Sequence, residues 1–191
     1  MCKHETQFSP DRVYRYTLWR DWPMLDGLER QGFGRDRAYA MFIGLNPSTA
    51  DETKDDPTIR RCIRFAKDWG YGALCMTNLF AFRATDPKVM EAAKDPVGPD
   101  NDVWLVKESL KAGVVIAAWG TRSGNRGKDV FQLLERDVYC LGKTKEGHPR
   151  HPLYVRADTL AEVCWSAPHP TRVSGEGGGN GTKYLGIYES F

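Results

Sequence analysis

The amino-acid sequence predicts an α/β fold: a three-layer sandwich in which helices cover both faces of a central, mostly parallel sheet. Apolar runs of strand length alternate along the chain with segments that carry apolar residues at helical spacing. Most of these runs are continuously apolar, which is typical of strands covered on both faces. Ligands of such folds bind where loops leave the carboxyl ends of the strands, so the loops after these runs are candidate functional segments.

Five segments have the composition of strands. Residues 12–19 alternate polar and apolar side chains, as in a half-buried strand at the edge of a sheet. The buried strands are expected at 38–45, 73–80, 114–120 and 138–141.

Helices are expected between the strands. Pro57 opens the first, at a position where its missing N–H costs nothing, and Gly70 ends it. Further helices are expected at 102–110 and 129–136.

The length and composition fit one domain. Of 191 residues, 41% are hydrophobic and 27% are charged, which is close to the globular average. We expect a single domain over 1–165 and a tail over 166–191, whose glycine-rich stretch adds backbone entropy and no core. The sequence has no apolar run near the roughly 20 residues of a membrane span and no secretory signal. We therefore expect a soluble, cytoplasmic monomer.

The cysteines and charges exclude some classes of site. Five cysteines without a C-x-x-C pair predict neither a disulfide framework nor a metal site, and we expect no cofactor. A formal net charge of +2 does not identify a partner. The basic residues Arg60, Arg61, Arg64 and Lys67 recur at helical spacing, as on a solvated helix face or on a surface that faces phosphates.

The loop from Gly44 to Asp51 is the first candidate for a functional site. Glycine, asparagine and proline follow a buried strand, a combination that fixes the backbone while exposing the Asn46 side chain. Asn46 and Pro47 are either part of a binding site or simply form the turn. The sequence contains no glycine pattern of a dinucleotide site or P-loop.

Two other segments carry polar side chains at strand ends or in stiff loops. The segment 147–155 contains two His-Pro pairs, at His148 and His151. A histidine held in a stiff loop can donate a fixed hydrogen bond to developing negative charge, although such pairs also serve structural roles. Asn78 ends the second buried strand, and would lie beside Asn46 if the two strands are neighbours.

The order of these motifs resembles the uracil-DNA glycosylase superfamily. The resemblance lies in Gly44-x-Asn46-Pro47, Thr77-Asn78, an apolar strand ending in Gly120, and His151-Pro152-x-Tyr154-Val155. From Met41 to about Val155 the chain is also similar to an uncharacterised bacterial and phage family, which we place in that superfamily. That similarity lies in Asn46-Pro47-Ser48-Thr49-Ala50-Asp51, in Asp56 to Cys62, and in Arg150-His151-Pro152-Leu153-Tyr154.

The resemblance implies an enzyme that flips a nucleotide out of the stack and breaks its glycosidic bond through an oxocarbenium-like transition state. Asn46 would position the attacking water, Asn78 would pair with the Watson–Crick edge, and His151 would donate to a base oxygen. Phe80 or Phe82 would either stack on the base or pack in the core. The expected base-binding residues are Gly44, Pro47, Ser48, Asn78 and Phe80, and the expected DNA contacts are Arg60, Arg61, Arg122 and Arg150.

The sequence departs from the superfamily pattern in the acid and the cysteines. Branches with strong uracil activity carry aspartate at the position of Asn46, and an amide cannot accept a proton from water. Asp51, Asp55 or Asp56 would supply the carboxylate, unless this loop is merely solvated; Asp51 and Asp56 are our candidates. The four spaced cysteines of the iron–sulfur branches are absent, so no cluster is predicted.

Ser48 suggests the class of substrate. Uracil-specific members place a tyrosine after the proline, where it excludes substituents at C5 of the pyrimidine, whereas Ser48 is small. We expect a C5-modified pyrimidine in double-stranded DNA, for example glucosylated 5-hydroxymethylcytosine of phage DNA, and hence an antiviral role. The alternatives are a nucleic-acid or nucleotide-binding module without activity and a hydrolase of free modified nucleotides.

Overall fold

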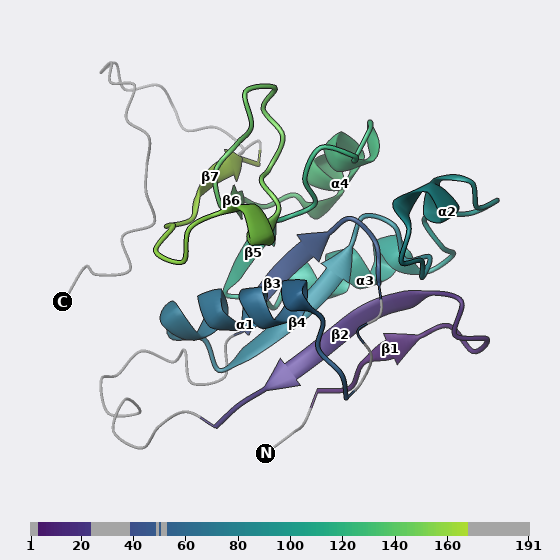
Figure 1. Ribbon diagram of the computed structural model, residues 1–191, viewed down its shortest axis with the longest axis horizontal. Helices are drawn as coiled ribbons and strands as arrows, with labels where there is room; N and C mark the ends of the chain where they lie inside the picture. The colour runs from purple at the N-terminus through teal and green to yellow at the C-terminus, as the bar shows by residue number, and fades with distance from the viewer. Residues whose placement is uncertain (1–3, 24–38, 49, 51–52, 168–191) are drawn as a thin grey trace.

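A computed structural model describes residues 4–23, 39–48, 50 and 53–167. These residues form a central sheet with helices on both faces (Figure 1), so the expected α/β class is confirmed. The sheet has seven strands in the order β1-β2-β4-β3-β5-β6-β7. The strands are β1 (Gln7–Phe8), β2 (Arg15–Asp21), β3 (Tyr39–Gly44), β4 (Ala73–Asn78), β5 (Val114–Ala117), β6 (Val138–Cys140) and β7 (Glu162–Trp165). The helices are α1 (Pro57–Asp68), α2 (Pro87–Glu91), α3 (Asn101–Ser109), α4 (Arg126–Leu134) and the 3-10 helix η2 (Pro152–Tyr154).

The four central strands, β4, β3, β5 and β6, are parallel, and β2 and β7 flank them in antiparallel orientation. Within the parallel strands Gly44 pairs with Asn78, and Ile43 pairs with Ala117. The carboxyl ends of β3, β4 and β5 therefore meet at one edge of the sheet, where the candidate loops of the sequence also lie.

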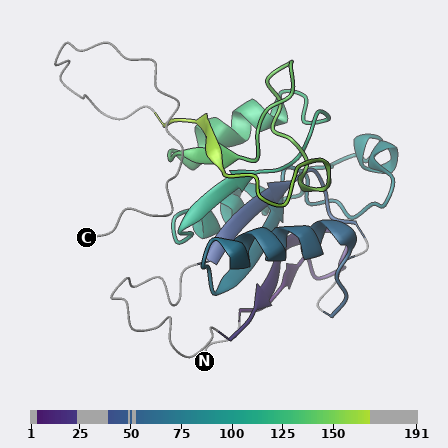
Figure 2. The ribbon, with the colours of Figure 1, turned by 60° about the vertical axis from the view of Figure 1, so that its left-hand side comes forward.

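The helices cover opposite faces of the sheet. Figures 1 and 2 show α1 lying across one face, where its Ile59 and Phe65 pack with Phe42 of β3. On the other face, Leu105 of α3 and Val130 of α4 pack against strand residues that point the opposite way. Alternate residues of β3 thus enter different cores, which explains its continuous apolar sequence. Burial of each large apolar side chain contributes about 1.5–3 kcal/mol.

The sequence misplaced one strand and missed four short elements. The strand expected at 12–19 begins at Arg15 and is not at the edge, because β1 pairs with it. Its residues 15–19 are all buried, rather than alternately exposed. β1, α2, η2 and β7 were not predicted, because two to five residues are too few to show a periodicity.

The remaining expectations concern the tail, the thiols and the membrane. The tail expected at 166–191 lies outside the described residues from position 168 onward. Cys62, Cys75, Cys140 and Cys164 are free thiols. Within the described ranges, none of the helices has the length and apolar character needed to cross a membrane.

Gly44 permits an unusually close approach between β3 and β4. A Cβ atom at this position would lie 2.6 Å from Cε of Met76 and 2.9 Å from Oδ1 of Asn78. Both distances are shorter than Cβ atoms tolerate, so any other residue must displace these two side chains. The absence of a side chain at Gly44 therefore allows the Asn78 amide to lie where it does.

We expect Gly44→Ala to lower the free energy of unfolding by about 1–3 kcal/mol, the usual cost of overpacking a core. Urea unfolding of the variant and the wild type measures the change. In a Met76→Leu background, which lacks the Cε atom, the same substitution should cost less. An equal cost in both backgrounds would show that the Met76 contact is not the cause.

Candidate functional site

A cavity of about 390 Å³ lies at the carboxyl ends of β3, β4 and β5. Its volume falls within the range of about 300–1,000 Å³ that is typical of small-molecule sites. The loops after β3 and β5, the first turn of α1 and the loop that carries His151 form most of its wall. Among its lining residues are Arg15, Gly44, Asn46, Ser48, Asp56, Asn78, Trp119, Arg122, His151 and Tyr154.

Three residues predicted to act together line this cavity: Asn46, Asn78 and His151. β3 and β4 are adjacent and in register, so Asn46 and Asn78 lie at the same edge of the sheet. His151 comes from a loop more than 70 residues later in the chain and reaches the same cavity beside Gly120, whose Cβ position would be 3.7 Å from Cβ of His151. Strand order, which the sequence left open, brings these residues together.

The amide of Asn46 has a fixed orientation. Its Nδ2 donates to the backbone oxygen of Ala84 at 2.8 Å and to that of Pro47 at 3.2 Å. Both hydrogen bonds use the nitrogen, and no described residue donates to Oδ1. The side chain therefore presents an acceptor oxygen, which can orient a water molecule but cannot take its proton.

Asn78 is a buried amide with an unused donor. The residue is 1% exposed, and its Nδ2 has no hydrogen-bond partner among the described residues. Its backbone oxygen accepts a 3.1 Å hydrogen bond from Nδ2 of Asn101, a fully buried residue of α3 that also binds Leu79. A buried donor without a partner costs about 1–3 kcal/mol, and an acceptor brought by a ligand would recover part of this cost.

His151 is held in one tautomer by its own loop. Its Nδ1 accepts a hydrogen bond from the backbone N–H of Leu153 at 3.4 Å, so in the neutral ring the proton is on Nε2. Burial lowers the pKa of His151 below its ordinary value of 6.5, although the Asp56 carboxylate partly opposes this by raising it. The site thus holds a neutral imidazole with one N–H donor.

The other His-Pro pair, at His148, lies away from the cavity. His148 does not line the cavity. Its backbone N–H and oxygen bind the side chain and the backbone N–H of Thr144, which closes a turn. Of the two histidines between which the sequence alone left the choice open, His151 lies at the cavity and His148 does not.

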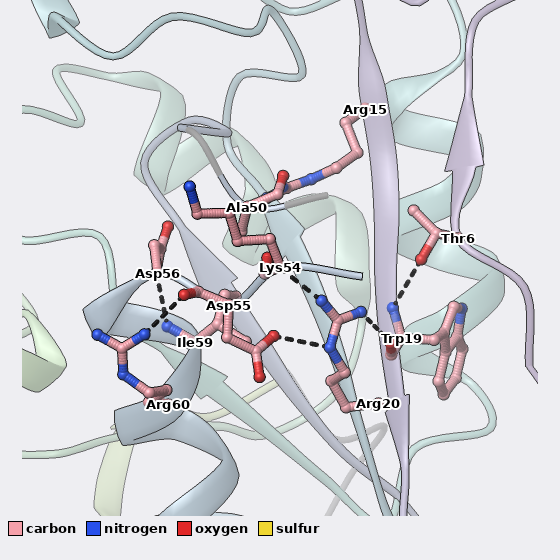
Figure 3. A network of polar contacts seen from close by, with 10 residues as sticks. All are labelled: Thr6, Arg15, Trp19, Arg20, Ala50, Lys54, Asp55, Asp56, Ile59 and Arg60. Carbon is pink, nitrogen blue, oxygen red and sulfur yellow. Dashed lines mark hydrogen bonds and ion pairs between the residues drawn. The ribbon is translucent and has the colours of Figure 1, made fainter. Parts of the chain in front are cut away.

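The acidic segment before α1 serves mainly to begin the helix (Figure 3). Oδ1 of Asp56 accepts from the backbone N–H of Ile59 at 2.8 Å, a standard N-cap bond. Asp55 points toward β2, where its carboxylate pairs with Nε of Arg20 at 2.7 Å. Of the described residues, Asp56 alone supplies a carboxylate to the cavity wall. Asp51 lies outside the described residues.

Two predicted base-binding residues do not line the cavity. Phe80 packs against the core on the α3 and α4 face, so the expected stacking on a base is not supported. Pro47 is buried, and its backbone oxygen binds Ala84 and Asn46. Gly44 and Ser48 do line the cavity. Phe80 follows a buried strand and belongs to the core, which is the alternative that the sequence allowed.

Only one of the four arginines predicted to contact DNA lines the cavity. Arg122 does so, while it pairs with Glu91 at 3.2 Å. The other three bind backbone oxygens: Arg60 that of Asp55, Arg61 that of Val155, and Arg150 that of Lys143. These arginines connect segments around the cavity, and they do not form part of its wall.

Arg15 lines the cavity although the sequence did not predict it as a site residue. It is 2% exposed, and its Nη1 donates to the backbone oxygen of Ala50 at 2.5 Å, which connects β2 to the loop after β3 (Figure 3). Charged side chains are rarely this buried. The alternating pattern of residues 12–19 did not predict the burial of Arg15, because it did not show which face of the strand is covered.

The sequence pattern of a protein family described as "Protein of unknown function (DUF1643)" matches residues 15–153. The chain belongs to this family. The matched region begins at Arg15 and ends just after His151, so it contains most of the cavity wall. No curated protein and no solved structure matches the chain. Within the described ranges, no cluster of three or more histidine, cysteine or acidic side chains is arranged to hold a metal ion.

Protonation of His151 should destabilise the fold. Because its folded-state pKa lies below 6.5, the unfolded chain binds more protons as the pH falls through 6.5, and stability decreases from there down to the folded-state pKa. Urea unfolding at pH values on both sides of 6.5 measures this dependence. We expect His151→Gln to reduce the dependence and the control His148→Gln to retain it; equal curves for His151→Gln and wild type would contradict the assignment.

Proposed function

We propose that this chain is a DNA glycosylase, related to the uracil-DNA glycosylases, that excises a C5-modified pyrimidine from double-stranded DNA. The observation that carries the proposal is the convergence of Asn46, Asn78 and His151 on one cavity at the carboxyl edge of the sheet. The three come from separate segments, and their order along the chain is the one in which the superfamily motifs occur.

The groups present suit the charges that develop during hydrolysis. As the bond between C1′ and the base nitrogen breaks, the electron pair stays on the base and positive charge grows on the sugar. Nε2–H of His151 donates to the base oxygen that becomes negative. The Asp56 carboxylate stabilises the cationic sugar, and water held by Oδ1 of Asn46 bonds to C1′ and finally gives its proton to the departing base.

Asn78 and Ser48 would select the base. The amide of Asn78 can pair with either uracil or cytosine, because rotation about its last bond exchanges oxygen and nitrogen. Ser48 is a small residue in the cavity wall and leaves space for a substituent at C5. Glucosylated 5-hydroxymethylcytosine of phage DNA is our candidate, which would give the protein a role in antiviral defence.

A binding module without activity is the second candidate, and one observation favours it. Asp56, the sole carboxylate placed on the cavity wall by the described residues, already caps α1. A cap bond uses only Oδ1, however, and the second carboxylate oxygen can still face a substrate. The two candidates differ in whether any base is released.

The test is an assay for abasic sites on DNA that contains normal bases, uracil, 5-hydroxymethylcytosine or its glucosylated form. We expect abasic sites in the glucosylated DNA. His151→Ala should lower the rate on the order of 100-fold or more, the typical effect of losing one preorganised donor, and His148→Ala should not. Cleavage of uracil DNA alone would overturn the substrate, and full activity of His151→Ala would overturn the site.

The two helix-capping aspartates offer a matched test of the carboxylate. Asp56 caps α1 from the cavity wall, whereas Asp86 caps α2 and does not line the cavity. Asparagine caps helices as well as aspartate, so both Asp→Asn variants should keep their stability. We expect Asp56→Asn alone to lose excision activity, and equal activities would assign Asp56 to capping only.

A further inference from the structure

A second cavity, of about 450 Å³, adjoins the first and has a different composition. Its lining residues are Arg12, Val13, Ser48, Phe82, Arg83, Ala84 and Thr85. Ser48 lines both cavities, and the backbone oxygen of Ala84 holds the Asn46 amide of the first. A ligand that filled the first cavity would therefore continue toward the second.

Two arginines from distant segments meet at this second cavity. Arg12 belongs to the turn between β1 and β2, and Arg83 follows β4. Both guanidinium groups lie over the ring of Phe8, at 3.9 Å and 5.1 Å from its centroid. Arg83 also donates to the backbone oxygen of Arg12 at 3.0 Å, and its backbone N–H binds Val13. Stacking and hydrogen bonding thus hold two like charges side by side.

The turn that carries Arg12 is built with some strain. Arg12 has a φ of 59°, in the left-handed region that residues with a side chain seldom adopt. Hydrogen bonds of Asp11 to the Ser9 hydroxyl and to the Val13 N–H stabilise the turn, and these bonds hold the pKa of Asp11 below its ordinary value. Strain of this kind is concentrated at binding and catalytic sites.

Arg83 is one of the arginines whose charge is not balanced by a carboxylate among the described residues. Several others pair with carboxylates, namely Arg20, Arg64, Arg122, Arg126 and Arg156. Arg83 forms no ion pair with any residue that the structure describes, and its Nε is buried without a hydrogen-bond partner there. The guanidinium fork matches the oxygen atoms of a phosphate, and an aromatic ring beneath it reduces the entropy lost on binding.

We propose that this second cavity binds a phosphate group of the nucleic-acid strand whose base enters the first cavity. The inference rests on the proposed function in that the ligand is a nucleic-acid strand. Arg83 and Arg12 bind the phosphate oxygens, and this contact sets the register of the strand relative to Asn46. The phosphate of a free nucleotide has the same chemistry, so the experiment must separate the two sources.

The first arm measures binding of a fluorescein-labelled duplex that carries one tetrahydrofuran abasic analogue, by anisotropy at salt concentrations between about 50 and 200 mM. This probe has no base at the target position, so its binding does not depend on excision. We expect Arg83→Gln and Arg12→Gln each to reduce the magnitude of the slope of log K against log salt by up to about 0.9, the value for the one phosphate contact that they share. Lys111→Gln removes the same charge just before β5, at the opposite edge of the sheet, and should leave the slope unchanged.

The second arm compares the affinity of each variant for deoxycytidine 5′-monophosphate with its affinity for deoxycytidine. If Arg83→Gln selectively loses affinity for the monophosphate while its duplex slope is unchanged, the strand phosphate is overturned and the site is assigned to the phosphate of a free nucleotide. The proposal is overturned if Arg83→Gln matches Lys111→Gln in both arms. It is also overturned if Arg83→Gln weakens only duplexes with a glucosylated base, because the cavity would then hold the C5 substituent.

Two further measurements separate this proposal from a folding defect and from the proposed function. Arg83→Lys keeps the charge but loses the fork, so we expect an intermediate duplex affinity at a melting temperature close to that of the wild type. If Arg83→Gln does not fold, Arg83→Lys and Arg12→Gln decide the outcome. Intact phosphate binding without any excision would contradict only the proposed function, and excision with unchanged salt slopes would contradict only this inference.

Discussion

The candidate site depends on the in-register pairing of β3 with β4, which sets Gly44 opposite Asn78. A Cβ atom at position 44 would lie 2.9 Å from the amide oxygen of Asn78, which is too close. Because Gly44 has no Cβ, the Asn78 amide can lie beside it. The loop after Gly44 then carries Asn46 along the same edge. If the pairing register of β3 shifted by one residue, each of its side chains would point into the core on the opposite face of the sheet. The hydrophobic pattern that folds the sheet therefore also positions the site.

Among the described residues, the cavity wall combines neutral hydrogen-bonding groups with one carboxylate and two arginines, Arg15 and Arg122. The Asn46 amide is fixed by two backbone oxygens, and His151 stays neutral because burial lowers its pKa. Asp56 adds a negative charge at the N-cap of α1. The His151 donor and the Asp56 carboxylate suit a reaction in which a leaving group becomes negative while the sugar becomes positive, because each developing charge meets a group of the appropriate kind.

The sequence predicted the parallel centre of the sheet better than its flanks. Tyr39–Gly44 and Ala73–Asn78 are buried on both faces and therefore show as continuous apolar runs, and Pro57 marks the first residue of α1. β7 has four residues, too few for a periodic signal. Burial of Arg15 and the environment of Phe80 depend on contacts between distant segments, which local composition does not encode. The site residues were predicted through a family resemblance, while their convergence required the strand order.

The central claim is that Asn46, Asn78 and His151 form one pocket for a base. Its most direct test is an NMR titration of the ¹⁵N-labelled protein with glucosylated 5-hydroxymethyldeoxycytidine, which observes the two side-chain amides and the imidazole separately. We predict that all three signals shift together with a single dissociation constant, while the imidazole of His148 does not shift. Binding that leaves the Asn78 amide and the His151 ring unchanged would contradict the claim.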